Sequence, residues 1–145
     1  MSIATFNEPA AHIDLLNALL ARLNGTDGLG GMSPARVAYR RDLAPKQGGD
    51  YVLLDVTRTA GGNRRIGGGI APSSWYATTT AVGTSVGNAS ALLRRSTLAL
   101  VGYEMTVGAE TSTGIDFDGS MESPIEEDEH DRSLWAGSRT FTFAF

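Results

Sequence analysis

The sequence predicts an α+β fold, in which two helices pack on one face of a mainly antiparallel sheet of about four to five strands. Three observations support this prediction. Two stretches repeat apolar residues at the spacing of a helical face, several others alternate with period two, and the two patterns are interspersed along the chain. With 145 residues, 41% of them hydrophobic, the chain is expected to form a single domain over residues 1–145 around one core.

The first helix is predicted over Asn7–Leu23. Asn7 is a favourable N-cap, Glu8 places an acid in the first turn, and Pro9 suits the first helical position. Gly25 follows where a left-handed C-cap is expected. The apolar face is wide, so this helix is expected to be well buried or to pack against a neighbouring subunit. Its residues are Ile13, Leu15, Leu16, Leu19, Leu20 and Leu23.

Period-two alternation predicts the strands. The clearest is the last, in which Phe141, Phe143 and Phe145 share one face. In the strand that begins at Trp75, β-branched and aromatic residues also suit a half-buried sheet surface. Loops are expected between the first helix and the early strands. The predicted strands are Arg36–Arg40, Tyr51–Arg58, Trp75–Val82, Tyr103–Thr111 and Arg139–Phe145.

The second helix follows a tight corner. Gly83 breaks the strand, and the hydroxyl of Ser85 or Thr84 is placed to cap the N–H groups of the helix. Arg94 and Arg95 fall on the face opposite the apolar one. The apolar or small residues of the buried face are Ala89, Leu92, Leu93, Ser96, Leu100 and Tyr103.

Two long connections separate these elements. Residues 60–74 contain five glycines and Pro72, and they are predicted to be a mobile loop or a protruding hairpin arm. That arm would carry Arg64, Arg65, Ile66 and Ile70. Residues 112–131 are polar and acidic, and they are predicted to be a connection that is too charged to belong to the core.

Charge is unevenly distributed along the chain. Residues 1–100 hold ten basic and six acidic residues, a net charge of +4, whereas residues 101–145 hold two basic and ten acidic residues, a net charge of −8. Neither part has the clustered basic face of a nucleic-acid binder. A mildly basic part and an acidic part suit contacts between copies of one chain.

Few residues suggest catalysis or metal binding. The sequence has no cysteine and only two histidines, His12 and His130, which argues against thiolate or histidine metal cages and cysteine nucleophiles. The Gly67–Gly69 run lacks the following helix and the lysine of a phosphate loop. We therefore expect no cofactor and no enzymatic activity.

The acidic connection leaves one alternative open. In a twelve-residue segment that begins at Asp116, residues with side-chain oxygens occupy positions 1, 3, 5, 7 and 12, as in the calcium loop of an EF-hand. Position 6, however, is Met121 rather than the glycine that the sharp turn needs, and Pro124 interrupts the loop. A solvated acidic loop is the competing interpretation. The residues with calcium-loop spacing are Asp116, Asp118, Ser120, Glu122 and Glu127.

No apolar run reaches the roughly 18 residues of a membrane span. The first ten residues, MSIATFNEPA, lack the basic start and apolar core of a signal peptide. We expect a protein that is made in the cytoplasm and has no membrane partner.

The order of these elements resembles that of the tail terminator, or tail completion, proteins of long-tailed bacteriophages and prophages. The resemblance extends over nearly the whole chain and is most specific in the corner from Val82 to Leu92. The other parts are the leucine-rich helix, the strand that ends in Tyr39, the YVLL strand from Tyr51, the irregular arm, and the final alternating strand. The glycine-rich loop 26–32 departs from the pattern, which has a more compact linker there.

The resemblance implies a structural virion protein at the head-proximal end of a tail. Such proteins form a ring, typically a hexamer, that stops tail-tube polymerisation and joins the head. The implied partners are further copies of the chain, the tail tube protein, and a head-completion or neck protein, with DNA passing through unbound. The alternatives are another neck or tail ring component, such as a head-completion or tube protein, and a small ligand-binding or enzymatic domain.

Closing a ring requires that one face of each copy meets a different face of the next. The basic and acidic parts of the chain are a hypothesis for these two faces. The candidate subunit or tube contacts are Arg64, Arg65, Ile66, Ile70, Arg94, Arg95, Glu126, Glu127, Asp128 and Glu129.

Overall fold

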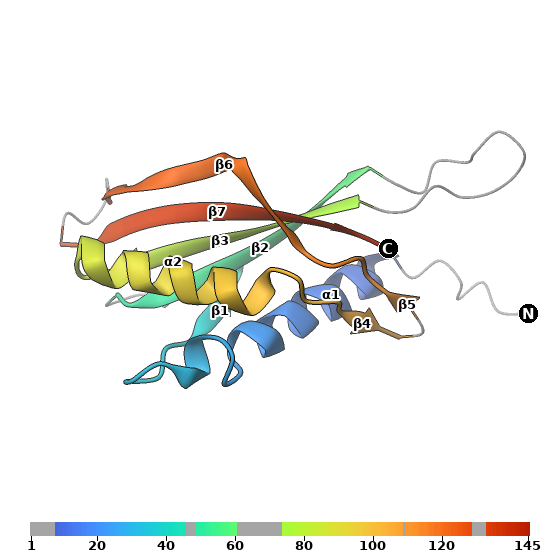
Figure 1. Ribbon diagram of the computed structural model, residues 1–145, viewed down its shortest axis with the longest axis horizontal. Coiled ribbons are helices and arrows are strands. Elements are labelled where there is room, and N and C mark those ends of the chain that lie inside the picture. The colour runs from blue at the N-terminus through green and yellow to red at the C-terminus, as the bar shows by residue number, and fades with distance from the viewer. Residues whose placement is uncertain (1–7, 46–48, 61–73, 109, 129–132) are drawn as a thin grey trace, which may run out of the picture.

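A five-stranded sheet forms one layer of the molecule, and two helices form the other (Figure 1). The computed structural model describes residues 8–45, 49–60, 74–108, 110–128 and 133–145. The strand order is β1-β2-β3-β7-β6; only the β1–β2 pair is parallel. The predicted α+β class and the mainly antiparallel sheet are therefore confirmed. The strands are β1 (Ala38–Arg40), β2 (Tyr51–Ala60), β3 (Ser74–Gly83), β6 (Asp116–Glu127) and β7 (Trp135–Ala144).

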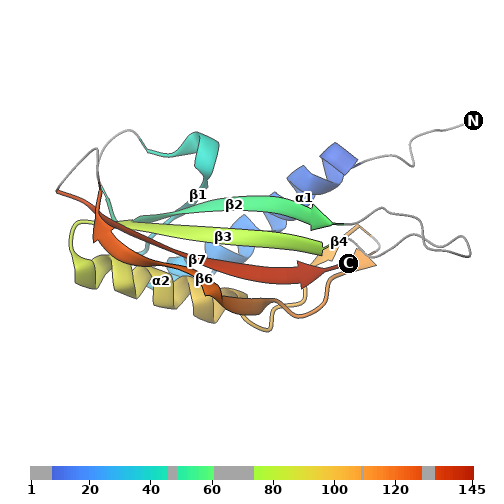
Figure 2. The ribbon, with the colours of Figure 1, turned by 90° about the horizontal axis from the view of Figure 1, so that it is seen from above.

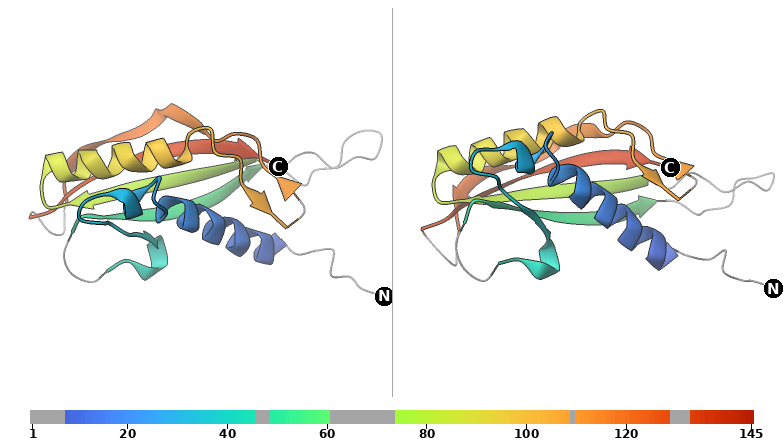
Figure 3. Two further views of the ribbon diagram at one scale, coloured as in Figure 1. Left: turned by 60° about the horizontal axis from the view of Figure 1, so that its bottom comes forward. Right: turned by 90° about the horizontal axis from the view of Figure 1, so that it is seen from below.

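Both helices cover the same face of this sheet (Figure 3). Helix α1 (Glu8–Leu23) lies over β1 and β2, and α2 (Val86–Leu100) lies over β3 and β7. The core fills the space between the two layers, and the alternation of buried residues in β3 follows the period-two pattern of the sequence. Its largest fully buried side chains include Leu15, Leu19, Leu23, Leu54, Leu92, Leu100 and Phe141.

The segment that follows α1 is held by one buried leucine and by hydrogen bonds to β1. Leu29, in the short 3₁₀ helix η1 (Leu29–Gly31), is fully buried. The side-chain amide of Asn24 donates to the carbonyl of Ala38 at 3.1 Å and accepts from its N–H at 2.7 Å, much as a neighbouring strand would. The end of α1 is thus joined directly to the start of β1.

The corner between β3 and α2 has the predicted geometry. Ser85 is the N-cap, and its Oγ accepts from the backbone N–H of Asn88 at 3.1 Å. A Cβ at Gly83 would lie 2.6 Å from the backbone nitrogen of Ala89, so the close approach of strand and helix requires glycine there.

Two strand predictions need correction in extent. Most of residues 103–111 is not a strand: only the two-residue strands β4 (Thr106–Val107) and β5 (Glu110–Thr111) form there, as a separate small sheet. The last strand begins at Trp135, four residues earlier than predicted. Alternation in the sequence cannot show how far the pairing of two strands extends. Here the pairing of β3 with β7 continues as far as Trp135.

The prediction that residues 112–131 are a connection is wrong for Asp116–Glu127, which forms β6. This strand lies at the edge of the sheet and pairs only with β7. An edge strand can carry charged residues because one of its edges faces solvent, and charges, register shifts and proline all discourage unwanted pairing there. β6 has all three: five acidic residues, shifts on both sides of Ser123, and Pro124.

Residues 61–73, the greater part of the predicted arm, lie outside the described residues. Within the described chain, neither helix is long and apolar enough to cross a membrane.

Candidate assembly surfaces

The two adjacent arginines of α2 have different roles. Arg94 is exposed to solvent. Arg95 is half-buried, and its guanidinium donates to the carbonyls of Gly28 and Thr26, both at 2.8 Å. Arg95 therefore fixes the loop after α1 within the subunit, and only Arg94 is available on the outer surface of the helix.

The acidic candidates lie at the end of β6. Glu126 and Glu127 are exposed, Asp128 is half-buried, and Glu129 lies outside the described residues. The backbone N–H of Asp128 donates to the carbonyl of Leu134 at 2.9 Å. Burial, together with the negative charge of Asp128, raises the pKa of Tyr51 above its usual value. The charge of Asp128, just after β6, thus acts on Tyr51 at the start of β2, although β3 and β7 lie between these two strands in the sheet.

The remaining candidates, Arg64, Arg65, Ile66 and Ile70, fall in the part of the chain that the structure leaves undescribed.

The calcium-loop alternative does not fit the geometry of β6. A strand advances about 3.3 Å per residue, so Asp116 and Glu127 lie roughly 30 Å or more apart and cannot converge on one ion. Glu122 is instead paired with Arg139 at 3.2 Å. Among the described residues, no group of three or more His, Asp or Glu side chains is placed to hold a metal ion.

His12 has a structural partner on each side. Its Nε2 lies 3.0 Å from the carbonyl oxygen of Val56, and its ring stacks on Trp75 with centroids 5.8 Å apart. The backbone carbonyl belongs to β2, beyond the point where β1 ends opposite Leu54. His12 therefore links α1 to an edge of the sheet that no strand of the described chain covers.

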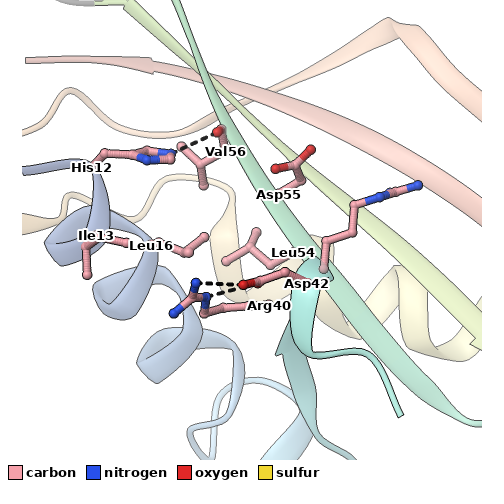
Figure 4. Close-up of a pocket in the computed structure, with 9 residues that line it drawn as sticks. His12, Ile13, Leu16, Arg40, Asp42, Leu54, Asp55 and Val56 are labelled. Atoms are coloured by element: carbon pink, nitrogen blue, oxygen red, sulfur yellow. Dashed lines mark hydrogen bonds and ion pairs between the residues drawn. The ribbon is translucent and has the colours of Figure 1, made fainter. Parts of the chain in front are cut away.

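A groove lies beside this open edge, between α1 and β2 (Figure 4). It has a volume of about 470 Å³. Its apolar part consists of Ile13 and Leu16 from α1 and Leu54 and Val56 from β2. Charged residues line the rest: Arg40, Arg41, Asp42 and Asp55. Arg40 forms a two-pronged ion pair with Asp42, with distances of 3.1 and 2.8 Å.

Seven large hydrophobic side chains of the described residues are exposed, and six of them form two groups at opposite margins of the molecule. Sequence reasoning missed both groups, because their residues come from segments far apart in the chain. The α1–β1 edge comprises Ile13, Val37 and Leu43, and the α2–β6 edge comprises Leu98, Val101 and Phe117. Val86, at the start of α2, is the seventh.

No helix or strand of the described residues covers the face of the sheet opposite the helices (Figure 2). Its central part is rich in hydroxyl groups. Thr78 and Thr140 are directly opposite one another on β3 and β7, and their Oγ1 atoms lie 3.2 Å apart. The charged residues of this face lie toward its sides, on β2 and β6. The centre of the face is thus polar and uncharged.

The sequence matches no protein-family model and no curated protein. The fold does have a solved counterpart: it is similar to a chain in the structure titled "Virion of native gene transfer agent (GTA) particle", with a TM-score of 0.68 and 16% sequence identity. The match covers 90% of this chain and 92% of that chain. The two chains therefore share one α+β two-layer fold over almost their full lengths.

Proposed function

We propose that this protein is a structural component of a phage-type virion, namely a tail terminator that forms a ring on the end of the tail tube. The observation that carries the proposal is the near-complete overlap of its fold with a chain of a gene transfer agent virion. Its element order independently resembles that of tail terminators. Ring formation is the feature that separates this function from that of a monomeric domain.

In this role the ring stops tube polymerisation and provides the surface that joins the head. Its partners are further copies of the chain, the tail tube protein, and a head-completion or neck protein, and DNA passes through the ring. A hexamer is the expected ring. The function is non-enzymatic, and no cofactor takes part in it.

Electron microscopy of the purified protein, with multi-angle light scattering on the same sample, tests the proposal. Closed six-fold rings are the expected result. Long tubes formed by the protein alone would indicate a tube protein, and monomers at all concentrations would contradict any ring component.

The terminator role has its own test, which uses the tail tube protein as the polymerising partner. Tubes assembled with this protein present should be short and uniform in length, with a ring at one end. Tubes of unlimited length in its presence would assign the ring to another position in the neck or tail.

The charge hypothesis for the candidate residues has a separate measurement. Reversing the charge of Arg64 and Arg65, or of Glu126 to Glu129, should weaken the ring and make its assembly more dependent on salt. Unchanged assembly of both variants at low salt would remove these residues from the interface.

A further inference from the structure

We propose that the α2–β6 edge of one copy docks against the α1–β1 edge of a second copy, with the groove between α1 and β2 receiving its apolar side chains. This inference rests on the proposed ring and names the contact that would close it. The two edges lie at opposite margins of the same sheet (Figure 3).

The α2–β6 edge combines residues from the end of α2 and the start of β6. The backbone N–H of Gly102 donates to the carbonyl of Ile115 at 2.8 Å, which brings the end of α2 beside the start of β6. Arg139 lies between them: it donates to Thr97 Oγ1 at 2.9 Å, and its guanidinium lies 5.4 Å from the centre of the Phe117 ring. Leu98, with 62% of its surface exposed, projects from the same helix.

The α1–β1 edge offers the matching shape. Its groove has an apolar floor made by α1 and β2. Leu43, in the 3₁₀ turn η2 (Arg41–Leu43), is 60% exposed and directly follows the groove residue Asp42. A few side chains in well-packed pockets that exclude water typically carry most of the energy of an interface.

Part of the backbone of this edge is also open, apart from the carbonyl of Val56, which lies 3.0 Å from His12 Nε2. The backbone N–H of Val52 donates to the carbonyl of Val37 at 3.2 Å, on the side of β2 that faces away from β3. Because the direction of the backbone groups alternates along a strand, every second residue after Val52 points its N–H and carbonyl to that same side. β1 ends opposite Leu54, and six further residues of β2 continue past it, to Ala60. No strand of the described chain pairs with them on that side.

Charge disfavours one of the alternative pairings of copies, that of two α2–β6 edges with each other. Two α2–β6 edges facing each other would bring together two copies of Asp116–Glu127, in which Glu122 is paired with Arg139 and four further carboxylates remain. The charged rim of the groove is balanced, with Arg40 and Arg41 against Asp42 and Asp55. Like-charge repulsion therefore disfavours a two-fold dimer through β6, whereas the head-to-side contact that a ring needs carries no such cost.

Cysteine crosslinking tests the contact directly, because the chain has no cysteine of its own. Ile13→Cys or Leu43→Cys supplies one edge, and Leu98→Cys or Val101→Cys supplies the other. Each single variant and all four paired variants are treated with a short bis-maleimide at ring-forming concentration. We expect a ladder of covalent oligomers from at least one paired variant and monomers from every single variant.

A complementation experiment gives an independent readout. The variant Ile13→Asp with Leu43→Asp loses one edge, and the variant Leu98→Asp with Val101→Asp loses the other. Each alone should self-associate roughly tenfold or more weakly than the unmodified protein, while an equimolar mixture should form a one-to-one heterodimer through the two intact edges. Native mass spectrometry measures both, and thermal unfolding by circular dichroism verifies that the variants are folded.

The outcomes separate this inference from the proposed function. If both aspartate variants still form rings in the electron microscope, the edge-to-edge contact is wrong but the proposed ring stands. Covalent oligomers from rings of a single-cysteine variant would lead to the same conclusion. Unmodified protein that forms no rings, together with the absence of a ladder from all four paired cysteine variants, would overturn both.

Discussion

Asp50 accepts a hydrogen bond from the backbone N–H of Thr84, 34 residues away, with a distance of 3.1 Å. The same carboxylate lies 3.7 Å from Arg36, and the Thr84 hydroxyl accepts from the side chain of Asn88 at 3.0 Å. One acidic side chain thus joins the start of β2, the segment before β1, and the corner that leads into α2. Asp50 also has a positive φ of 65°, a conformation that Asp and Asn tolerate better than most residues.

Replacing Asp50 tests the importance of this junction. Asp50→Ala should lower the free energy of unfolding by about 2–3 kcal/mol, because it removes a charge-assisted acceptor and places alanine at positive φ. Asp50→Asn keeps an acceptor oxygen and the tolerance for positive φ, so it should cost about half as much. Urea unfolding measures both, and equal losses would mean that the backbone conformation and the acceptor contribute little.

The adjacent arginines of α2 should contribute unequally to the stability of the subunit. Arg95→Ala should lower the free energy of unfolding by about 1.5–3 kcal/mol, because two carbonyls lose a charged donor. Arg94→Ala should change it by no more than about 0.5 kcal/mol, since Arg94 is exposed. Chemical denaturation of the two variants checks this, and an equal effect of both would contradict the different roles assigned to them.

Two glycines only four residues apart should respond oppositely to alanine. Gly83→Ala should destabilise by about 1–3 kcal/mol, because the new methyl group meets the backbone of Ala89. Gly87 lies in the first turn of α2, and the nearest atom to a new Cβ there is Ser85 Oγ at 3.8 Å. Gly87→Ala should therefore stabilise by about 0.5–1 kcal/mol. The melting temperatures of the two variants should move in opposite directions.

Neighbouring threonines of β3 form a further matched pair. Thr79 is fully buried, and its Oγ1 has no hydrogen-bond partner among the residues that the structure describes. Thr79→Val keeps the shape and removes an unsatisfied polar group, so it should stabilise by roughly 1 kcal/mol.

Thr78→Val supplies the control for this prediction. It loses the contact with Thr140 on the open face of the sheet, so it should be neutral or destabilising. If Thr78→Val raised the free energy of unfolding as much as Thr79→Val, the stabilisation would come from the β propensity of valine rather than from removal of a buried polar group.

The local elements of this protein could be predicted from sequence because their signals are local. The leucine spacing of residues 8–23, the glycine and serine at the corner, and the alternation around Trp75 and Phe141 each act through neighbours in the chain or through one face of one element. The extent of β7 and the existence of β6 could not be predicted in the same way. A charged edge strand has no hydrophobic alternation to mark it, and its identity depends on the hydrogen bonds that β7 offers.

The roles of the candidate surface residues also depended on contacts that the sequence does not show. Arg94 and Arg95 looked equivalent on a helical wheel, and only the position of the loop at Thr26–Gly31 distinguished them, because it placed two carbonyls within reach of Arg95. His12 gave no sign of its contacts with Val56 and Trp75, which come from two strands far along the chain.

By itself, the sequence determined the α+β class, the capped corner before α2, and the separation of charge between the two parts of the chain, since these follow from composition and short-range periodicity. Only the tertiary structure decided that the acidic segment is an edge strand and that β2 extends past β1. It alone gathered the exposed apolar residues at two opposite margins. Such features depend on which segments become neighbours in space, and that is set by packing the whole core at once.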